Sequence, residues 1–288
     1  MAGFLGTTTS FSIFEAPVPS KLDFEAVRAW AFSDAVTPEG TRLGWVGLGN
    51  AVDTDFSFGI DHGRFAALSL RVDSRKASGA ALKLQLAEAV QEELAQSGHI
   101  SNEREKELRE AILAKLISKA EWTPALTDCL WDLEKGRLLV AASPKAALPL
   151  LERFTSTFGV DAQPYTPNED LPSFFARLSR ENVSVNGREL SCAGSATLAT
   201  PLHVEGKMAV AVQNNENTIA SALDEGLIIR KLAMIADATL EFSLDTSLTV
   251  SGLKLPRAEK GADMDTDFLL KADVCVMVAD LALAIAGV

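Results

Sequence analysis

Apolar and polar residues alternate in several short stretches of the chain, and this period of two predicts β-strands. The first stretch is residues 11–14. Most of the others occur in pairs around a short polar or glycine-containing turn, which predicts β-hairpins. The paired stretches are 56–60 and 65–72 around Asp61-His62-Gly63, 129–133 and 137–141 around Glu134-Lys135-Gly136, the two halves of 183–190 around Asn186-Gly187, and 239–244 and 248–255 around Asp245-Thr246-Ser247.

Residues 80–119 follow a different pattern, with a period close to four, and predict a helical arm made of two helices. Gly98 is expected to end the first helix. Asn102 and Glu105 resemble the capping box that begins the second. The apolar positions that define the two faces are Leu82, Leu86, Val90, Leu94, Leu108, Ile112 and Leu116.

Three further helices are expected outside the arm. Asp23 is expected to cap the first, which carries Phe24, Val27, Trp30 and Ala31 at helical spacing. Ser143-Pro144 is typical of a helix start, and Gly159 is typical of its end. Pro149 removes a backbone donor within this segment, so we expect a kink or a later start. The last helix is expected from about Asp267 to Ala286, with apolar residues around most of its circumference.

Hairpins together with separate helices indicate an α+β fold, with antiparallel β-hairpins or sheets, segregated helices and a helical arm. The proline-rich stretch 159–172 is the best candidate for a connection between domains. We therefore expect an N-terminal α+β domain formed by residues 1–74 and 122–160, a helical-hairpin arm at 75–121, and a C-terminal α+β domain at 161–288.

Composition and charge restrict the function. The chain has 288 residues, 47% of them apolar, which is enough for a substantial core. It carries 27 basic and 39 acidic residues, a formal net charge of −12, which excludes a protein that coats nucleic acid through bulk positive charge. Contact with a polyanion would need a locally basic face. The arm, with eight basic and eight acidic residues in 75–121, is the more basic region of an acidic chain.

The sequence predicts a cytoplasmic protein. Its cysteines, Cys129, Cys192 and Cys275, are far apart and form no CxxC pair, which indicates a reducing compartment. The N-terminus lacks the basic and apolar segments of a signal peptide. Charged residues interrupt the longest apolar stretch, at the C-terminus, so no membrane span is expected.

No motif predicts catalysis, a metal or a cofactor. The three histidines, His62, His99 and His203, have no partner at metal-ligand spacing. The run Asp263-Met264-Asp265-Thr266-Asp267 fails the requirements of a calcium loop, and helix capping by Asp265 or Asp267 explains it without an ion. Gly47-Leu48-Gly49 lacks the third glycine of a dinucleotide fingerprint. We expect a protein without catalytic residues, metal or cofactor.

The order of these segments resembles the recombination-associated protein RdgC, a bacterial family, from about residue 22 to the end of the chain. No single motif is diagnostic, and the ordered series carries the resemblance. Its members are Ala31-Phe32, Leu43-Gly44-Trp45-Val46, the charged arm, Trp131-Asp132, Gly136 to Val140, Ile219-Ala220, and Gly226 to Met234 with Lys231-Leu232-Ala233.

The resemblance implies a non-enzymatic protein that forms a ring-shaped homodimer around a positively lined hole. Such a protein binds double- and single-stranded DNA without sequence preference and restrains a RecA-type recombinase by occupying its DNA. It would be cytoplasmic and associated with the nucleoid. Phosphate contacts by Lys and Arg would supply the affinity and make it dependent on salt.

The resemblance also suggests site residues. The family aromatic at the tip of the arm, which is thought to lock the ring, aligns at Glu121, beside Trp122, and we expect these two residues at the dimer interface. The family's basic segment before Ile219 is replaced by apolar residues at 208–212. The expected DNA-binding residues are Arg71, Arg75, Lys76, Lys115, Lys119, Lys207, Gln213, Arg230 and Lys231.

Two other functions remain open. The first is a protein–protein interaction module on the same fold with little affinity for DNA, which the apolar segment 208–212 favours. The second is a metal-dependent nuclease, since the family has also been labelled an exonuclease. Acidic residues are too abundant in this chain for any of them to be nominated as catalytic.

Overall fold

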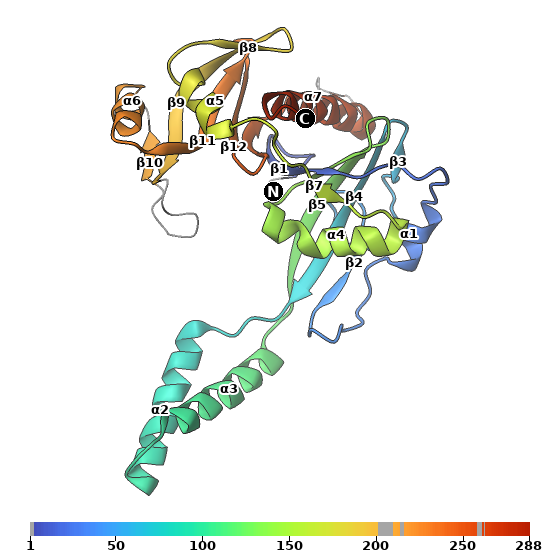
Figure 1. Cartoon of the computed structure of the whole chain (residues 1–288). Helices are drawn as coiled ribbons and strands as arrows, with labels where there is room; N and C mark the ends of the chain where they lie inside the picture. Colours follow the sequence, from blue (N-terminus) through green and yellow to red (C-terminus); the bar gives the residue numbers. More distant parts are fainter. Residues whose placement is uncertain (1–2, 201–209, 214–215, 258–260, 262) are drawn as a thin grey trace. The chain divides into compact units, whose positions relative to one another are not determined.

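A computed structural model describes residues 3–200, 210–213, 216–257, 261 and 263–288. Seven helices and thirteen strands in this part of the chain make an α+β fold, as the sequence predicts (Figure 1). The elements are β1 (Thr8–Glu15), α1 (Glu25–Ala29), β2 (Arg42–Val46), β3 (Asp61–His62), β4 (Phe65–Ser74), α2 (Gly79–Ser97), α3 (Asn102–Lys119), β5 (Thr123–Asp132), β6 (Arg137–Val140), α4 (Pro144–Phe158), β7 (Gln163–Pro164), α5 (Leu171–Leu178), β8 (Val183–Val185), β9 (Arg188–Ala199), β10 (Val210–Gln213), α6 (Glu216–Asp224), β11 (Ile228–Ala236), β12 (Leu240–Asp245), β13 (Thr249–Lys254) and α7 (Met264–Ile285).

The strands form one sheet in the order β10-β9-β11-β12-β13-β1-β6-β5-β4-β2, with β3 on β4, β7 on β1 and β8 on β9. Strand β1 joins the strands from the two halves of the chain. It pairs antiparallel with β13, where Phe11 lies opposite Val250, and with β6, where Ile13 lies opposite Leu139. Both of the expected α+β domains therefore contribute strands to the same sheet.

Contacts divide the chain into two compact units. The first unit comprises residues 1–31, 45–70 and 127–288, and the second comprises 32–44 and 71–126. The expected arm lies entirely in the second unit. The boundary expected at 159–172 falls within the first unit.

The core of the first unit is closed by α7. Phe268, Cys275 and Leu283 of this helix are buried with apolar residues of the sheet. The carboxylate of Asp263 begins the helix by accepting a hydrogen bond from the backbone N–H of Thr266, at 2.7 Å. The expectation that Asp265 or Asp267 caps the helix is wrong, because the helix begins earlier than its apolar pattern indicates.

The predicted hairpins form, with one change. The turn at Asn186-Gly187 has φ values of +51° and +77°, the left-handed pair that a two-residue hairpin turn needs. The predicted strand at 56–60 is wrong: only Asp61 and His62 pair with β4. The turn of this hairpin is therefore Gly63-Arg64. Before Asp61, the carbonyl oxygen of Ile60 still accepts a hydrogen bond from the backbone N–H of Ala67, but residues 56–60 form no strand.

Helix α4 begins at Pro144 and continues through Pro149, so the expected later start is wrong. Pro144 lies in the first turn, where its missing N–H costs nothing. Gly159 ends the helix in the left-handed conformation, as predicted.

In the second unit, α2 and α3 form the helical hairpin that the sequence predicts (Figure 1). Gly98 ends α2 with φ +70°. The cap of α3 is Ser101, which accepts a hydrogen bond from the backbone N–H of Arg104 at 3.2 Å, so the prediction of Asn102 is wrong by one residue. Neither helix buries any of its residues within the chain.

Candidate nucleic-acid interface

Trp122 is the centre of a group of cationic side chains in the second unit. The guanidinium carbon of Arg75 lies 4.2 Å from the centroid of its indole ring, and that of Arg42 lies 4.3 Å from it. A guanidinium at this distance is attracted by the negative face of the ring. The Nε atoms of both arginines are shielded from solvent and have no hydrogen-bond partner among the described residues, so stacking contributes much of what holds these side chains in place.

The two arginines differ in how much of their charge is already compensated. Arg42 forms an ion pair with Asp34, with 2.6 Å between Nη1 and Oδ1. Arg75 pairs with no carboxylate in the described chain, and its Nη1 donates a weak hydrogen bond to the carbonyl oxygen of Ser118, at 3.4 Å. Arg75 is therefore the better placed of the two to bind an external anion.

Three lysines extend this group, two on α3 and one in the segment between β4 and α2. Lys76 follows Arg75 in the chain, Lys119 follows Ser118, and Lys115 precedes Lys119 by one helical turn. All three are exposed. Residues 111–120 contain no acidic side chain, and the arm then ends at Glu121, an exposed carboxylate directly before Trp122. We call Arg42, Arg75, Lys76, Lys115, Lys119 and Trp122 the arm-base cluster.

The cluster contains four of the predicted DNA-binding residues. It adds Arg42, which the sequence analysis did not nominate. The only indication in the sequence is that Arg42 immediately precedes the Leu43–Val46 segment that carries the resemblance. Its contact with Trp122 joins residues eighty positions apart and depends on tertiary structure.

The guanidinium of Arg71, another predicted DNA-binding residue, is largely occupied by contacts within the chain. Its Nε and Nη2 donate to the two carboxylate oxygens of Asp73, at 2.8 and 2.7 Å. Its guanidinium also stacks on Phe32, at 3.9 Å. Because Asp73 is buried, the charge of Arg71 is compensated where it lies. These hydrogen bonds raise the pKa of Arg71.

Glu121 and Trp122, the predicted dimer residues, do not lie at the tip of the arm. Helix α3 ends at Lys119, and the chain enters β5 at Thr123, so both residues lie between the last turn of the arm and the sheet strand. The tip is formed by the turn at Gly98. The indole is in contact with two arginines of the same chain, Arg42 and Arg75, whereas Glu121 is exposed.

Arg230 and Lys231 lie in the first unit, on β11. This strand has a bulge between Ile229 and Lys231, opposite β9. The bulge shifts the alternation of the strand: Ile229 and Leu232 are buried, and the two basic residues between them are only partly buried. Lys231 lies directly opposite Asp245 of β12, whose carboxylate lowers the positive potential there.

The remaining two predicted DNA-binding residues are Lys207 and Gln213. Lys207 lies outside the described residues. Gln213 ends β10, with its backbone opposite Ser195 of β9.

Charge is distributed unevenly between the two units. The second unit carries ten basic and eleven acidic residues, and the first carries seventeen and twenty-eight. Nearly all of the net charge of −12 therefore belongs to the first unit. The arm-base cluster is locally positive within a unit that is close to neutral.

The described part of the chain contains neither a metal-binding cluster nor a membrane-spanning helix. No group of three or more His, Cys, Asp or Glu residues there is placed to hold a metal ion. Among the same residues, no helix is long and apolar enough to cross a membrane.

Comparison with known proteins gave one match. A family model described as "RdgC: Putative exonuclease, RdgC" matches residues 12–288, nearly the whole chain. No curated protein matches the sequence.

Proposed function

The chain belongs to the RdgC family, and we propose that it binds double- and single-stranded DNA without sequence preference, through phosphate contacts of the arm-base cluster. Family membership supports a recombination-related role associated with DNA. The finer role that we propose is to restrain a RecA-type recombinase by occupying its DNA as a ring-like homodimer, in the cytoplasm at the nucleoid.

The observation that carries the proposal is the stacking of both Arg42 and Arg75 on the ring of Trp122. Stacking on a rigid ring reduces the conformational freedom of both side chains before DNA binds, so less entropy is lost on binding. Because two guanidinium groups stack on the indole, they compete with a nucleic-acid base for the same ring. Contact through phosphate, which carries no sequence information, is the recognition that this arrangement supports.

The test compares two double variants of equal charge. Arg75→Gln with Lys119→Gln changes the cluster. Lys106→Gln with Arg109→Gln changes exposed residues of α3 that lie about 15–20 Å along the helix from Lys119, beyond the screening length at physiological salt. Fluorescence anisotropy with labelled duplex and single strands should show at least a tenfold loss of affinity for the first variant only. An equal loss in both variants would contradict a role for the cluster.

The proposed homodimer is supported by the apolar surface of the arm. Leu84 and Leu94 of α2 and Ile117 of α3 are exposed although both helices are well formed. Light scattering at micromolar concentration should give twice the mass of the chain. A single-chain mass at that concentration would contradict the dimer.

We propose that the protein acts without a catalytic step on DNA. An end-labelled duplex incubated with the protein and Mg²⁺ should remain intact over hours. Shortening of the labelled strand, abolished by chelation, would contradict the proposal and support a metal-dependent nuclease.

A protein-binding module with little affinity for DNA is the second candidate. The excess of acidic residues in the first unit favours it, because such a surface suits a basic protein partner. Absence of DNA binding at low salt would support this candidate against the first.

A further inference from the structure

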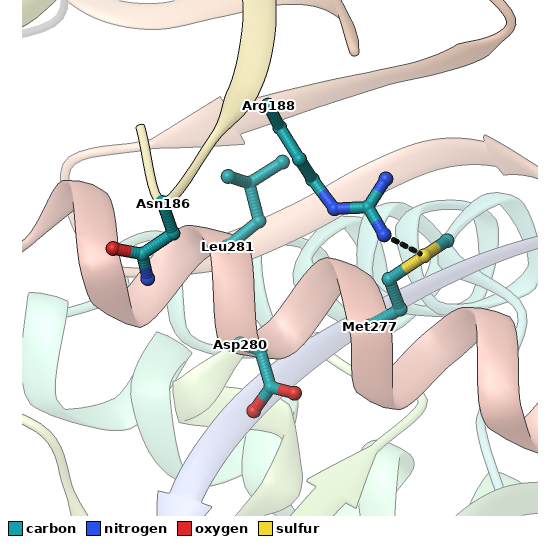
Figure 2. A pocket seen from close by; sticks show the side chains of 5 residues that line it. All are labelled: Asn186, Arg188, Met277, Asp280 and Leu281. Atoms are coloured by element: carbon teal, nitrogen blue, oxygen red, sulfur yellow. Dashed lines mark hydrogen bonds between the residues drawn. The ribbon is translucent and has the colours of Figure 1, made fainter. Parts of the chain in front are cut away.

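A small pocket of about 130 Å³ lies in the first unit between the β8–β9 turn and α7 (Figure 2). Its polar side chains do not converge, because Leu281 separates Asn186 from Arg188. The carboxylate of Asp280 points away from the hairpin and is already held by two cations. The pocket therefore offers no joint set of polar groups to a ligand.

The segment that joins β4 to α2, in the second unit, has different properties. It runs from Arg75 to Ser78, between the last residue of β4 and the first of α2. Ser78 is exposed and extended, with φ −65° and ψ +122°, and Lys76 is also exposed. The Ser78 hydroxyl accepts a long hydrogen bond from the backbone N–H of Ala81, at 3.4 Å. An enzyme can reach this hydroxyl group without unfolding a helix or a strand.

The residues before Ser78 distinguish it from the other serines of the chain. Arg75 and Lys76 stand three and two positions before it, and no other serine in the sequence has a basic residue at both positions. Three other serines have an arginine three positions before them and lie within a strand or a helix: Ser74, Ser156 and Ser191. Protein kinases select their substrates by charge patterns of this kind.

We propose that Ser78 is a phosphorylation site that regulates the arm-base cluster; the regulation, unlike the modification, rests on the proposed function. A protein kinase transfers the γ-phosphoryl group of a nucleoside triphosphate to Oγ of Ser78. The bond between the γ-phosphorus and its bridging oxygen breaks, a phosphate ester forms and the nucleoside diphosphate leaves. The hydroxyl proton passes to the catalytic base of the kinase. The ester adds a charge of about −1.5 to −2 at pH 7.

The added charge acts on the cluster because it is close to it. Three residues of extended chain span at most about 11 Å, which limits the backbone separation of Ser78 and Arg75. The screening length is about 10 Å at 0.1 M salt and increases at lower salt. Arg75 pairs with no carboxylate in the described chain, so the phosphate is a strong new acceptor for its guanidinium. Phosphorylated Ser78 therefore competes with DNA phosphates for the same cations.

The position of Ser78 allows the arm to stay folded after modification. Ser78 is the N-cap of α2, and the first turn of this helix contains no acidic residue. A negative charge at a helix N-terminus is stabilising, because the first N–H groups of the helix have no partner within it. A loss of DNA affinity after phosphorylation would thus arise from charge and not from unfolding of the arm.

Substitutions at Ser78 separate the charge from the loss of the hydroxyl group. Asp and Asn cap helices about as well as Ser, so Ser78→Asp and Ser78→Asn both keep the cap. In anisotropy titrations of labelled duplex at 50 mM salt, Ser78→Asp should weaken binding about two- to threefold, because it adds one negative charge beside the cluster. Ser78→Asn should bind like the wild type.

Ser101→Asp is the matched control. Ser101 is the exposed, extended N-cap of α3, and it accepts a hydrogen bond from the backbone N–H of Arg104 at 3.2 Å. It has no Lys or Arg among the three residues before it. It lies about 27 Å along α3 from Lys119, so the same added charge should leave DNA affinity unchanged.

Phosphorylation itself is tested on the full chain with ATP, Mg²⁺ and a protein kinase that prefers basic residues before serine. Mass spectrometry should show a phosphate at Ser78 that is absent in Ser78→Ala and retained in Ser101→Ala. The phosphorylated protein should bind duplex at least fivefold more weakly at 50 mM salt, because its charge exceeds that of aspartate. The difference should shrink at 200 mM salt, and a phosphatase should abolish it.

Absence of phosphate at Ser78 would overturn the modification site. Unchanged DNA affinity of the phosphorylated protein, or an equal loss in Ser78→Asp and Ser78→Asn, would overturn the regulation and leave the proposed function intact. If the unmodified protein binds no DNA at 50 mM salt, the proposed function and the regulation fail together. The mass measurement then still decides whether Ser78 is modified.

Discussion

The guanidinium of Arg75 lies 4.2 Å from the centroid of the Trp122 ring and pairs with no carboxylate in the described chain. It is thus held in position by an uncharged group, and its charge remains available to an anion. Arg71, only four residues earlier, is held by the buried carboxylate of Asp73. Two arginines that look equivalent in the sequence therefore have different expected roles.

The first prediction concerns Trp122. Trp122→Leu removes the ring that positions Arg42 and Arg75, and each stacking contact is worth about 0.5–1 kcal/mol at an exposed site. We expect affinity to fall about three- to tenfold, by the same factor for single- and double-stranded DNA. Anisotropy titrations with both substrates measure it.

Trp30 supplies the matched control for this substitution. It stacks on Arg153 at 4.3 Å, lies in the first unit and is not a member of the arm-base cluster. Trp30→Leu should leave DNA affinity unchanged. A loss in Trp122→Leu that is confined to single strands would show base stacking instead and contradict the positioning role.

The second prediction is a gain of affinity. Asp34→Asn removes the carboxylate that compensates Arg42, and the aspartate side chain is largely exposed, so folding should be little affected. We expect DNA to bind about two- to threefold more tightly at 50 mM salt, because the local positive potential rises. Glu103→Gln, which removes the same charge about 24 Å along α3 from Lys119, should have no effect. Unchanged or weaker binding in Asp34→Asn would place Arg42 outside the interface.

The third prediction is that Arg71 contributes to the stability of the fold and not to DNA binding. Arg71→Gln leaves the buried carboxylate of Asp73 without its paired donor, and an unsatisfied buried group costs about 1–3 kcal/mol. Urea unfolding should show this loss, and the double variant with Asp73→Asn should recover part of it. DNA affinity of the folded Arg71→Gln protein should change less than twofold. A tenfold loss of DNA affinity with unchanged stability would contradict this prediction and show that Arg71 contacts DNA.

The fourth prediction concerns the buried carboxyl group of Asp128. Burial raises its pKa, although hydrogen bonds from the Ser69 hydroxyl and the Phe4 amide oppose the change. A raised pKa in the folded state means that the folded protein retains the proton to higher pH than the unfolded chain. The contribution to stability is present below the ordinary pKa, near 3.8, and is lost as the pH rises through the raised value.

Asp128→Asn removes this dependence. The free energy of unfolding of the variant, relative to the wild type, should therefore increase from pH 4 to pH 7. Urea denaturation at several pH values measures the difference. A difference that is constant or decreases with pH would show that the hydrogen bonds dominate and that the pKa is not raised.

Local sequence patterns were sufficient to predict much of the fold. Asn186-Gly187 determines its hairpin because two adjacent left-handed residues are needed at that turn, and Gly98 ends α2 for a related reason. Residues 56–60 do not form the predicted strand. The alternation of apolar and polar residues indicates a segment that could bury one face in a sheet, but it does not determine which strand would pair with it. The bulge at Arg230, which places two consecutive residues on one side, depends on the register with β9.

The candidate site was predictable only in part. Arg75, Lys76, Lys115 and Lys119 were nominated because the resemblance and the charge of the arm pointed to them. The sequence does contain a signal for the pairing of Arg71, since residues two apart in a strand share a face and Asp73 is at that spacing. Arg42 could not be found, because its contact with Trp122 joins distant parts of the chain.

The most direct test of the central claim is the salt dependence of duplex binding by the unmodified protein. The account predicts binding at 50 mM salt without sequence preference. With about three phosphate contacts, affinity should fall about 40-fold between 50 and 200 mM salt. No binding at 50 mM, or affinity that is independent of salt, would contradict recognition of DNA phosphates by the arm-base cluster.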